Sequence, residues 1–167
     1  MLQHVLESAL RQTMNRLVRP VLNPAVPVPL QRRIVRQAYR SSTPPRGAKF
    51  ENITIGGVPA TRTTFGNDPR GAVLYLHGGG YIIGSSSTHR GITGHLAKTT
   101  GCAIVTPDYR LAPEFPFPAA LDDAEACWNG LLEAGLKPDQ IAVAGDSAGG
   151  GLSVALAMRL RDKGLQL

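Results

Sequence analysis

A serine between two glycines lies near the end of this chain, in the run Gly145-Asp146-Ser147-Ala148-Gly149. It follows a short apolar run at 141–144 and precedes a stretch of helix-forming residues. Glycines two positions before and after a serine are typical of a tight turn from a strand into a helix, because the backbone bends there without a Cβ clash. The hydroxyl of Ser147 would be exposed at such a turn as a nucleophile, beside N–H groups that stabilise a developing oxyanion.

A second glycine-rich run, His77-Gly78-Gly79-Gly80-Tyr81, follows the apolar run at 71–76. Consecutive glycines let several backbone N–H groups point at one place, which an oxyanion hole requires. Alone, a triple glycine could be a simple flexible turn. Its presence in one chain with the serine turn favours the oxyanion-hole interpretation.

The serine also needs a base and an acid that orients the base. In α/β enzymes with this serine turn, both follow the serine in the sequence. After Ser147 the only acid is Asp162, and there is no histidine. Of the earlier histidines, we interpret His77 as a residue that orients the glycine loop. His4, His89 and His95 are assigned no part in catalysis, and we expect packing or solvent-exposed roles for His89 and His95.

The elements that must position these residues form an alternating pattern. A β-hairpin is predicted at 49–55 and 58–65, on either side of a Gly-Gly turn, and buried strands at 71–76, 102–105 and 141–144. Helices are predicted at 88–100, at 119–134 and from residue 148 onward. Strands that alternate with helices indicate an α/β fold with a mostly parallel central sheet, in which the loops after the strands gather at one edge.

The first 46 residues carry most of the positive charge, with eight arginines against the single acid Glu7, a net charge of +7. Leucines and isoleucine recur there at helical spacing, so we favour amphipathic helices with solvated arginines. An interfacial membrane helix, a nucleic-acid patch and an organellar transit peptide are the alternatives. We disfavour them, and with them nucleic-acid or membrane partners, because four prolines between residues 20 and 29 interrupt the segment.

The rest of the composition indicates one ordinary globular unit. The 167 residues include no apolar run long enough to span a bilayer and no secretory signal pattern, so the cytoplasm is the expected location. Cys102 and Cys127 form no CxxC pair, and we expect both to be buried thiols. No metal site or cofactor is predicted.

Four motifs in order give the chain a specific resemblance: HGGGY at 77–81, YRLAPE at 109–114, FPAALDD at 117–123 and GDSAGG at 145–150. From about residue 47 the chain resembles the hormone-sensitive-lipase-like family of α/β-hydrolase esterases. The resemblance implies Ser147 as the nucleophile and the N–H groups of Gly79, Gly80 and Ala148 as the oxyanion hole. It implies site-shaping roles for His77, Gly78, Tyr81 and Asp146, and bracing roles for Tyr109, Arg110 and Glu114.

The same resemblance divides the chain into a helical cap segment at 1–45, covering an acyl pocket, and an incomplete catalytic part at 46–167. Family members are longer, so the expected fold is a partial α/β-hydrolase fold without its last strands, its acid and its histidine. Residues 141–144 would then form an exposed sheet edge, through which copies of the chain could associate.

Several functions remain open. The first is hydrolysis of short- to medium-chain acyl esters, with this chain being an inactive fragment or truncated product. The second is a non-catalytic protein that binds a small ligand on the same scaffold. The third is a nucleotide-binding α/β protein, which we disfavour because neither Gly-Lys-Ser/Thr nor a G-x-G-x-x-G that opens a helix occurs.

Overall fold

A mixed five-stranded sheet lies at the centre of the computed structural model, which describes residues 7–8, 11–12, 15–16, 19–39, 42–67 and 69–165. The strand order is β1-β2-β4-β3-β5. β3 lies parallel to β4 and β5, whereas β2 is antiparallel to both β1 and β4. The strands are β1 (Ala48–Ile55), β2 (Val58–Phe65), β3 (Ala72–Leu76), β4 (Ala103–Pro107) and β5 (Ile141–Gly145).

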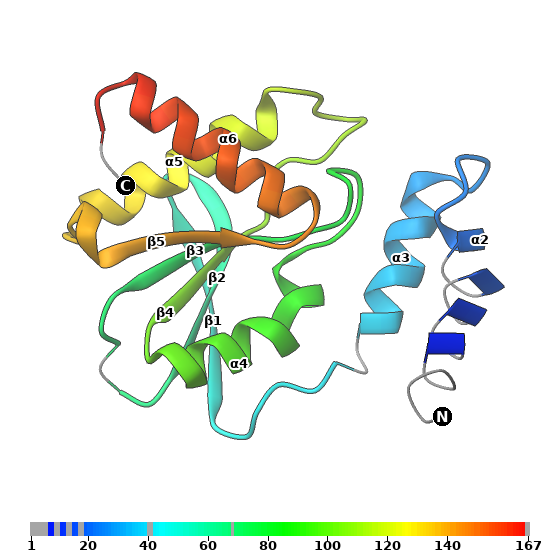
Figure 1. The fold of residues 1–167 in the computed structure, drawn as a ribbon, viewed down its shortest axis with the longest axis horizontal. Coiled ribbons are helices and arrows are strands. Elements are labelled where there is room, and N and C mark those ends of the chain that lie inside the picture. The colour runs from blue at the N-terminus through cyan, green and yellow to red at the C-terminus, as the bar shows by residue number, and fades with distance from the viewer. Residues whose placement is uncertain are drawn as a thin grey trace.

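Helices cover both faces of this sheet (Figure 1). One face carries α4 (Arg90–Thr100), which continues from the short 3-10 helix η3 (Ser86–His89). The other face carries α5 (Ala119–Glu133) and α6 (Ala148–Asp162), with the 3-10 turn η4 (Pro138–Gln140) before β5. The α/β fold class is therefore confirmed, and so are the predicted hairpin, strands and helices, with bounds that differ by at most two residues.

The two faces have separate apolar cores. β3 and β4 are buried along their whole length, as their apolar sequences predicted. Leu74 and Leu76 of β3 share one core with the single tryptophan, Trp128 of α5, and with buried leucines of α6. Val73 and Tyr75 face α4 on the opposite side of the same strand. This alternation fixes the position of β3, and with it the loop that begins at His77.

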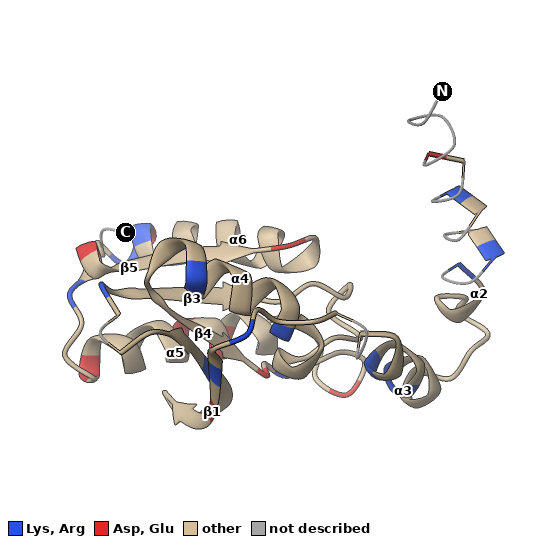
Figure 2. Cartoon of the chain, turned by 90° about the horizontal axis from the view of Figure 1, so that it is seen from below, with Lys and Arg blue, Asp and Glu red and all other residues tan. Residues whose placement is uncertain are grey.

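The N-terminal part lies beside the sheet rather than over one of its faces (Figures 1 and 2). It contains α2 (Arg19–Val21) and α3 (Val28–Ala38), and Pro29 lies in the first turn of α3, where a proline is tolerated. Residues 1–6, 9–10 and 17–18 lie outside the described residues, so the predicted helical pattern of leucines there stays a prediction. The assignment of 1–45 as a cap over an acyl pocket also stays a prediction.

The two cysteines differ in environment. Cys127 is buried on α5, its thiol points at the carbonyl oxygen of Ile55 (3.6 Å), and burial raises the pKa of the thiol to about 12. The prediction was wrong for Cys102, which is only partly buried because it precedes β4 at the rim of the sheet. Neither thiol is in a disulfide. Among the described residues, no helix has the length and apolarity that a membrane span needs.

Candidate active site

Ser147 occupies a sharp turn between β5 and α6. Its φ of +50° and ψ of −120° lie in a region that side-chain-bearing residues rarely adopt, and such strain clusters at functional sites. The flanking glycines allow the turn to press against the end of β3. A Cβ on Gly149 would lie 1.9 Å from the carbonyl oxygen of Leu76, and one on Gly145 would lie 2.4 Å from the carbonyl oxygen of Gly149. The glycine spacing is therefore a requirement of packing as well as of the turn.

Asp146 joins the serine turn to the glycine loop. Its Oδ1 accepts hydrogen bonds from the backbone N–H of Gly78 (2.9 Å) and the hydroxyl of Tyr75 (2.9 Å). A Cβ on Gly78 would lie 2.2 Å from Oδ2 of Asp146, so a larger residue there would displace this carboxylate. Burial, with the carboxylate of Asp146 adding to it, raises the pKa of Tyr75. This arrangement supports the predicted orienting role of Asp146.

The backbone at the serine leaves several donors unused. Gly79 and Gly80 adopt positive φ values of +126° and +61°. Within the described part of the chain, the N–H groups of Gly79, Gly80 and Ala148 donate no hydrogen bond. Gly80 and Ser147 are exposed and Gly79 is half-buried, so this corner of the molecule is open to a ligand. The predicted oxyanion donors thus lie on the two loops that Asp146 ties together.

His77 is fully buried behind the glycine loop. Its Nδ1 lies 2.8 Å from the carbonyl oxygen of Gly78, and its ring stacks on Tyr109 with centroids 4.2 Å apart. The hydroxyl of Tyr109 donates to the carbonyl oxygen of His77 (2.6 Å). Burial lowers the pKa of His77 to about 4, since the charged form would lose its hydration. His77 is therefore neutral near pH 7, as a residue that holds the loop.

His89 contacts Asp146 of the candidate site, which the sequence analysis did not predict. Its side chain is buried, its Nε2 lies 3.3 Å from Oδ1 of Asp146, and its Nδ1 lies 2.9 Å from the hydroxyl of Thr88. Tyr39 of the N-terminal part stacks on the same ring, with centroids 5.7 Å apart. The sequence analysis expected a packing or solvent-exposed role for His89, because Tyr39 and Asp146 both lie far from it in the sequence. His95 is exposed on α4, and His4 lies outside the described residues.

The hydroxyl of Ser147 has no base within the described residues: no hydrogen bond joins it to any of their side chains. Asp162, the only acid after Ser147, pairs with the neighbouring Arg161 at the last turn of α6. The structure thus brings together the predicted nucleophile, donors and orienting residue, but not a catalytic triad.

Tyr81 forms one wall of an apolar groove beside the glycine loop. It has a positive φ of +61°, and its carbonyl oxygen accepts a hydrogen bond from the N–H of Ala112 (2.8 Å). The groove has a volume of about 430 Å³, and its lining includes Gly80, Tyr81, Phe115, Phe117 and Leu152. It runs from Gly80 of the glycine loop to Leu152 and Ala155 on α6.

The loop at 107–114 is braced by two ion pairs. Arg110 bonds the carboxylate of Asp123 on α5 through its guanidinium (2.7–3.0 Å) and its backbone N–H (2.7 Å). Glu114 receives two hydrogen bonds from Arg32 of α3 (2.8 and 2.9 Å), and this pair lowers the pKa of Glu114. These contacts fit the bracing roles expected for Arg110 and Glu114.

Comparison with known proteins agrees with this geometry. Residues 73–167 match the model of a family described as alpha/beta hydrolase fold. LipR of Mycobacterium tuberculosis is 44% identical over 123 residues, which cover 73% of this chain and 40% of LipR. An acetyl-hydrolase of Streptomyces hygroscopicus is 43% identical over 115 residues, which cover 69% of this chain and 38% of that protein.

Among solved structures, a hormone-sensitive lipase from a metagenome library superposes with a TM-score of 0.89 at 35% identity, covering 98% of this chain and 54% of that one. The chain thus spans about half the length of the solved relative and less of the curated ones. Fold, motifs and similarity agree that the chain belongs to the hormone-sensitive-lipase-like family of α/β-hydrolase fold proteins.

Proposed function

We propose that this chain carries the nucleophile half of a serine ester hydrolase. The observation that supports it is the strained Ser147 beside backbone N–H groups without acceptors, at the positively polarised start of α6. In this reaction the serine oxygen attacks the acyl carbon while its proton passes to a base, and the oxyanion is held by the N–H groups. The alcohol leaves with that proton, and water then releases the acid and restores the hydroxyl.

We infer that the substrates carry short acyl groups, with acetyl esters first. The name of the Streptomyces hygroscopicus relative as an acetyl-hydrolase supports this choice. The groove beside Tyr81 is lined mainly by apolar side chains, which suits an apolar group better than a charged one. No residue of the described site calls for a cofactor.

We also propose that residues 1–167 alone do not turn over esters. The hydroxyl of Ser147 has no base among the described residues, and no histidine follows it in the sequence. Loss of the base in serine hydrolases lowers turnover by about 10⁴–10⁶. The same observation favours a second candidate, a protein that binds small acyl compounds in this groove without cleaving them.

A chimera separates these proposals. Residues 1–167 are joined to the part of the Streptomyces hygroscopicus acetyl-hydrolase that lies beyond the matched region, and hydrolysis of p-nitrophenyl acetate is measured. We expect the chimera to be active and Ser147→Ala to abolish the rate, while Ser153→Ala on α6 serves as the matched control. The chain alone should show no Ser147-dependent rate.

The outcomes are distinct. A folded chimera whose rate is the same with and without Ser147 would contradict the hydrolase proposal and leave the binding candidate. A Ser147-dependent rate from residues 1–167 alone would show instead that a base exists within this chain.

A further inference from the structure

α3 faces the rest of the molecule with a charged residue rather than with its apolar side. Arg32 donates hydrogen bonds to the carbonyl oxygens of Ile82 (2.8 Å) and Ala112 (3.0 Å), in addition to its ion pair with Glu114. Helices of globular proteins usually bury their apolar side against the core. Here Leu30 and Ile34 remain 47% and 37% exposed. Within the part of the chain that the structure describes, the apolar side of α3 is therefore still open to another partner.

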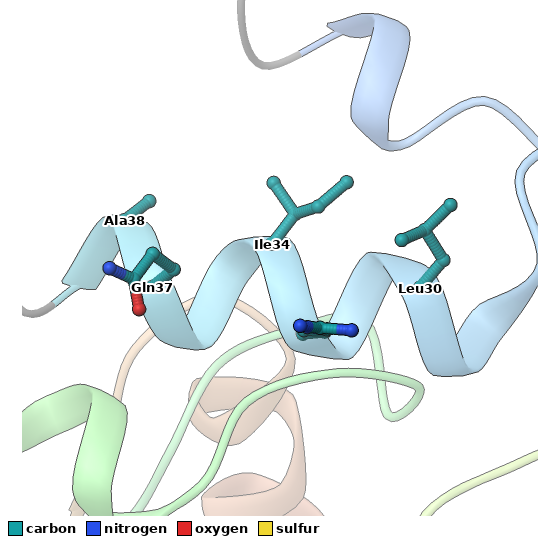
Figure 3. A pocket seen from close by; sticks show the side chains of 5 residues that line it. Leu30, Ile34, Gln37 and Ala38 are labelled. Carbon is teal, nitrogen blue, oxygen red and sulfur yellow. The ribbon is translucent and has the colours of Figure 1, made fainter.

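An open hollow lies over this apolar side. Leu30, Ile34 and Ala38 project from the same side of the helix, away from the loops of the α/β part (Figure 3). With Arg33 and Gln37 they line a space of about 720 Å³. Aliphatic side chains in a row four residues apart offer a continuous apolar strip.

A second hollow, rich in arginine, adjoins the first. It has a volume of about 680 Å³, and Arg33 and Arg36 of α3 face it together with Arg90 of α4 and the hydroxyl-bearing Ser42 and Ser87. Arg33 and Gln37 line both hollows, so the two hollows lie on either side of these residues.

None of these three arginines has a carboxylate partner among the described residues, in contrast to Arg32. No Asp or Glu occurs between Glu7 and Glu51 in the sequence. Figure 2 shows the basic residues on α3 and on the described residues before it. Arg90 lies over the ring of Phe50, 5.1 Å from its centroid, which leaves its N–H groups without a carboxylate. Exposed guanidinium groups without a carboxylate partner, beside hydroxyl groups, form a recognition site for phosphate.

We propose that this surface, formed by Leu30, Arg33, Ile34, Arg36, Ala38 and Arg90 and here called the α3 face, docks on an anionic phospholipid surface. The lipid phosphate would lie among the arginines, and the acyl chains against the aliphatic strip, as in helices that lie in a membrane interface. The prolines that argued against a membrane helix all lie before α3 or in its first turn, so they do not interrupt this surface. A nucleic acid would use the arginines but leave the strip of Leu30 and Ile34 in water.

The test is vesicle flotation with the whole chain, using phosphatidylcholine vesicles with and without phosphatidylglycerol. We expect binding only to the anionic vesicles, and weaker binding as NaCl is raised. Each basic residue near an anionic surface strengthens binding about fivefold. The double variant Arg33→Gln with Arg36→Gln should therefore reduce the partition coefficient about 25-fold. Arg70→Gln with Arg161→Gln removes the same charge from exposed sites elsewhere and should bind nearly as the unmodified chain does.

A second variant tests the apolar strip. Leu30→Ser with Ile34→Ser should also reduce vesicle binding at least tenfold while leaving the arginines in place. Circular dichroism confirms that each variant keeps its helix content, and Arg32 is unchanged in all of them.

Three results would overturn the proposal. The first is equal binding to neutral and anionic vesicles. The second is an equal loss of binding in the arginine variant of the α3 face and in the Arg70/Arg161 control. The third is binding to duplex DNA that is stronger than binding to vesicles and is unchanged in Leu30→Ser with Ile34→Ser. None of these measurements uses ester hydrolysis, so the proposal stands or fails independently of the proposed function.

Discussion

Asp146 accepts hydrogen bonds from Tyr75 and Gly78 through one carboxylate oxygen, and both donors are buried. Removing the carboxylate leaves two buried donors without an acceptor, each costing about 1–3 kcal/mol. We therefore expect Asp146→Ala to lower the free energy of unfolding by about 2–4 kcal/mol, and Asp146→Asn by less, because the amide keeps one acceptor oxygen. Urea unfolding followed by the fluorescence of the single, buried Trp128 measures the change.

Asp139→Ala is the matched control, since Asp139 is an exposed carboxylate on η4. If Asp146→Ala were no more destabilising than this control, Asp146 would not be the residue that joins the serine turn to the glycine loop.

His77 makes the stability of the fold depend on pH. Its pKa in the folded protein is about 4, below the ordinary value of 6.5, so between these values the unfolded chain binds the additional proton. Stability therefore falls as the pH is lowered through this window, by about 2 kcal/mol between pH 7 and pH 5. In His77→Gln this part of the pH dependence should disappear. His95→Gln, which alters an exposed histidine, should keep it, and equal slopes in both variants would rule out His77 as the origin.

Among single residues, the sequence predicted the positions where the backbone requires glycine better than it predicted contacts between side chains. Gly145, Gly149 and the glycine loop could be identified because positive φ and close packing exclude other residue types. Tyr75 and His89 could not be identified from the sequence as residues of the site. Tyr75 lies within a strand whose sequence is apolar throughout, and the contact of His89 with Asp146 exists only once β3, η3 and β5 are assembled. Local pattern carries no information on such long-range contacts.

Among the elements, α3 depends on Arg32 for its attachment to the α/β part. The ion pair is partly exposed, with side-chain exposures of 25% and 46%, so screening weakens it, but the bonds to the carbonyl oxygens of Ile82 and Ala112 add to it. Arg32→Met should make detachment of α3 easier by roughly 1–2 kcal/mol. We therefore expect amide hydrogen exchange in residues 28–38 to become about tenfold faster. Exchange followed by mass spectrometry measures this.

Arg36→Met is the control for that experiment, because it removes an arginine of the same helix that has no hydrogen bond or ion pair with the described residues of the α/β part. Similar exchange in both variants would mean that the attachment of α3 does not rest on Arg32.

Helices and strands could be predicted where the apolar residues follow a single clear pattern. The hairpin followed from alternating residues around Gly56-Gly57, and the two buried strands from uninterrupted apolar runs. The direction in which α3 turns its apolar side was not predictable. Helical periodicity shows that an apolar side exists, but only the contacts of Arg32 show that this side points away from the sheet.

At the scale of the whole molecule, one end of the sheet is uncovered. β5 is the last strand in the order, so its outer edge has no partner strand among the described residues. α6 packs on β5 and exposes Val154 and Met158, at 61% and 50%, on the same side of the helix. Unpaired backbone groups beside exposed apolar side chains are a common route to association between chains.

We therefore expect the purified chain to associate as its concentration is raised, and sedimentation velocity measures this. Val154→Glu should weaken association by about tenfold or more, because it replaces an apolar contact worth about 1.5 kcal/mol in each copy with a charge. Ile92→Glu is the matched control, since Ile92 is 44% exposed on α4, on the other face of the sheet. A chain that stays monomeric at every concentration, or equal effects of the two substitutions, would show that copies do not meet through β5 and α6.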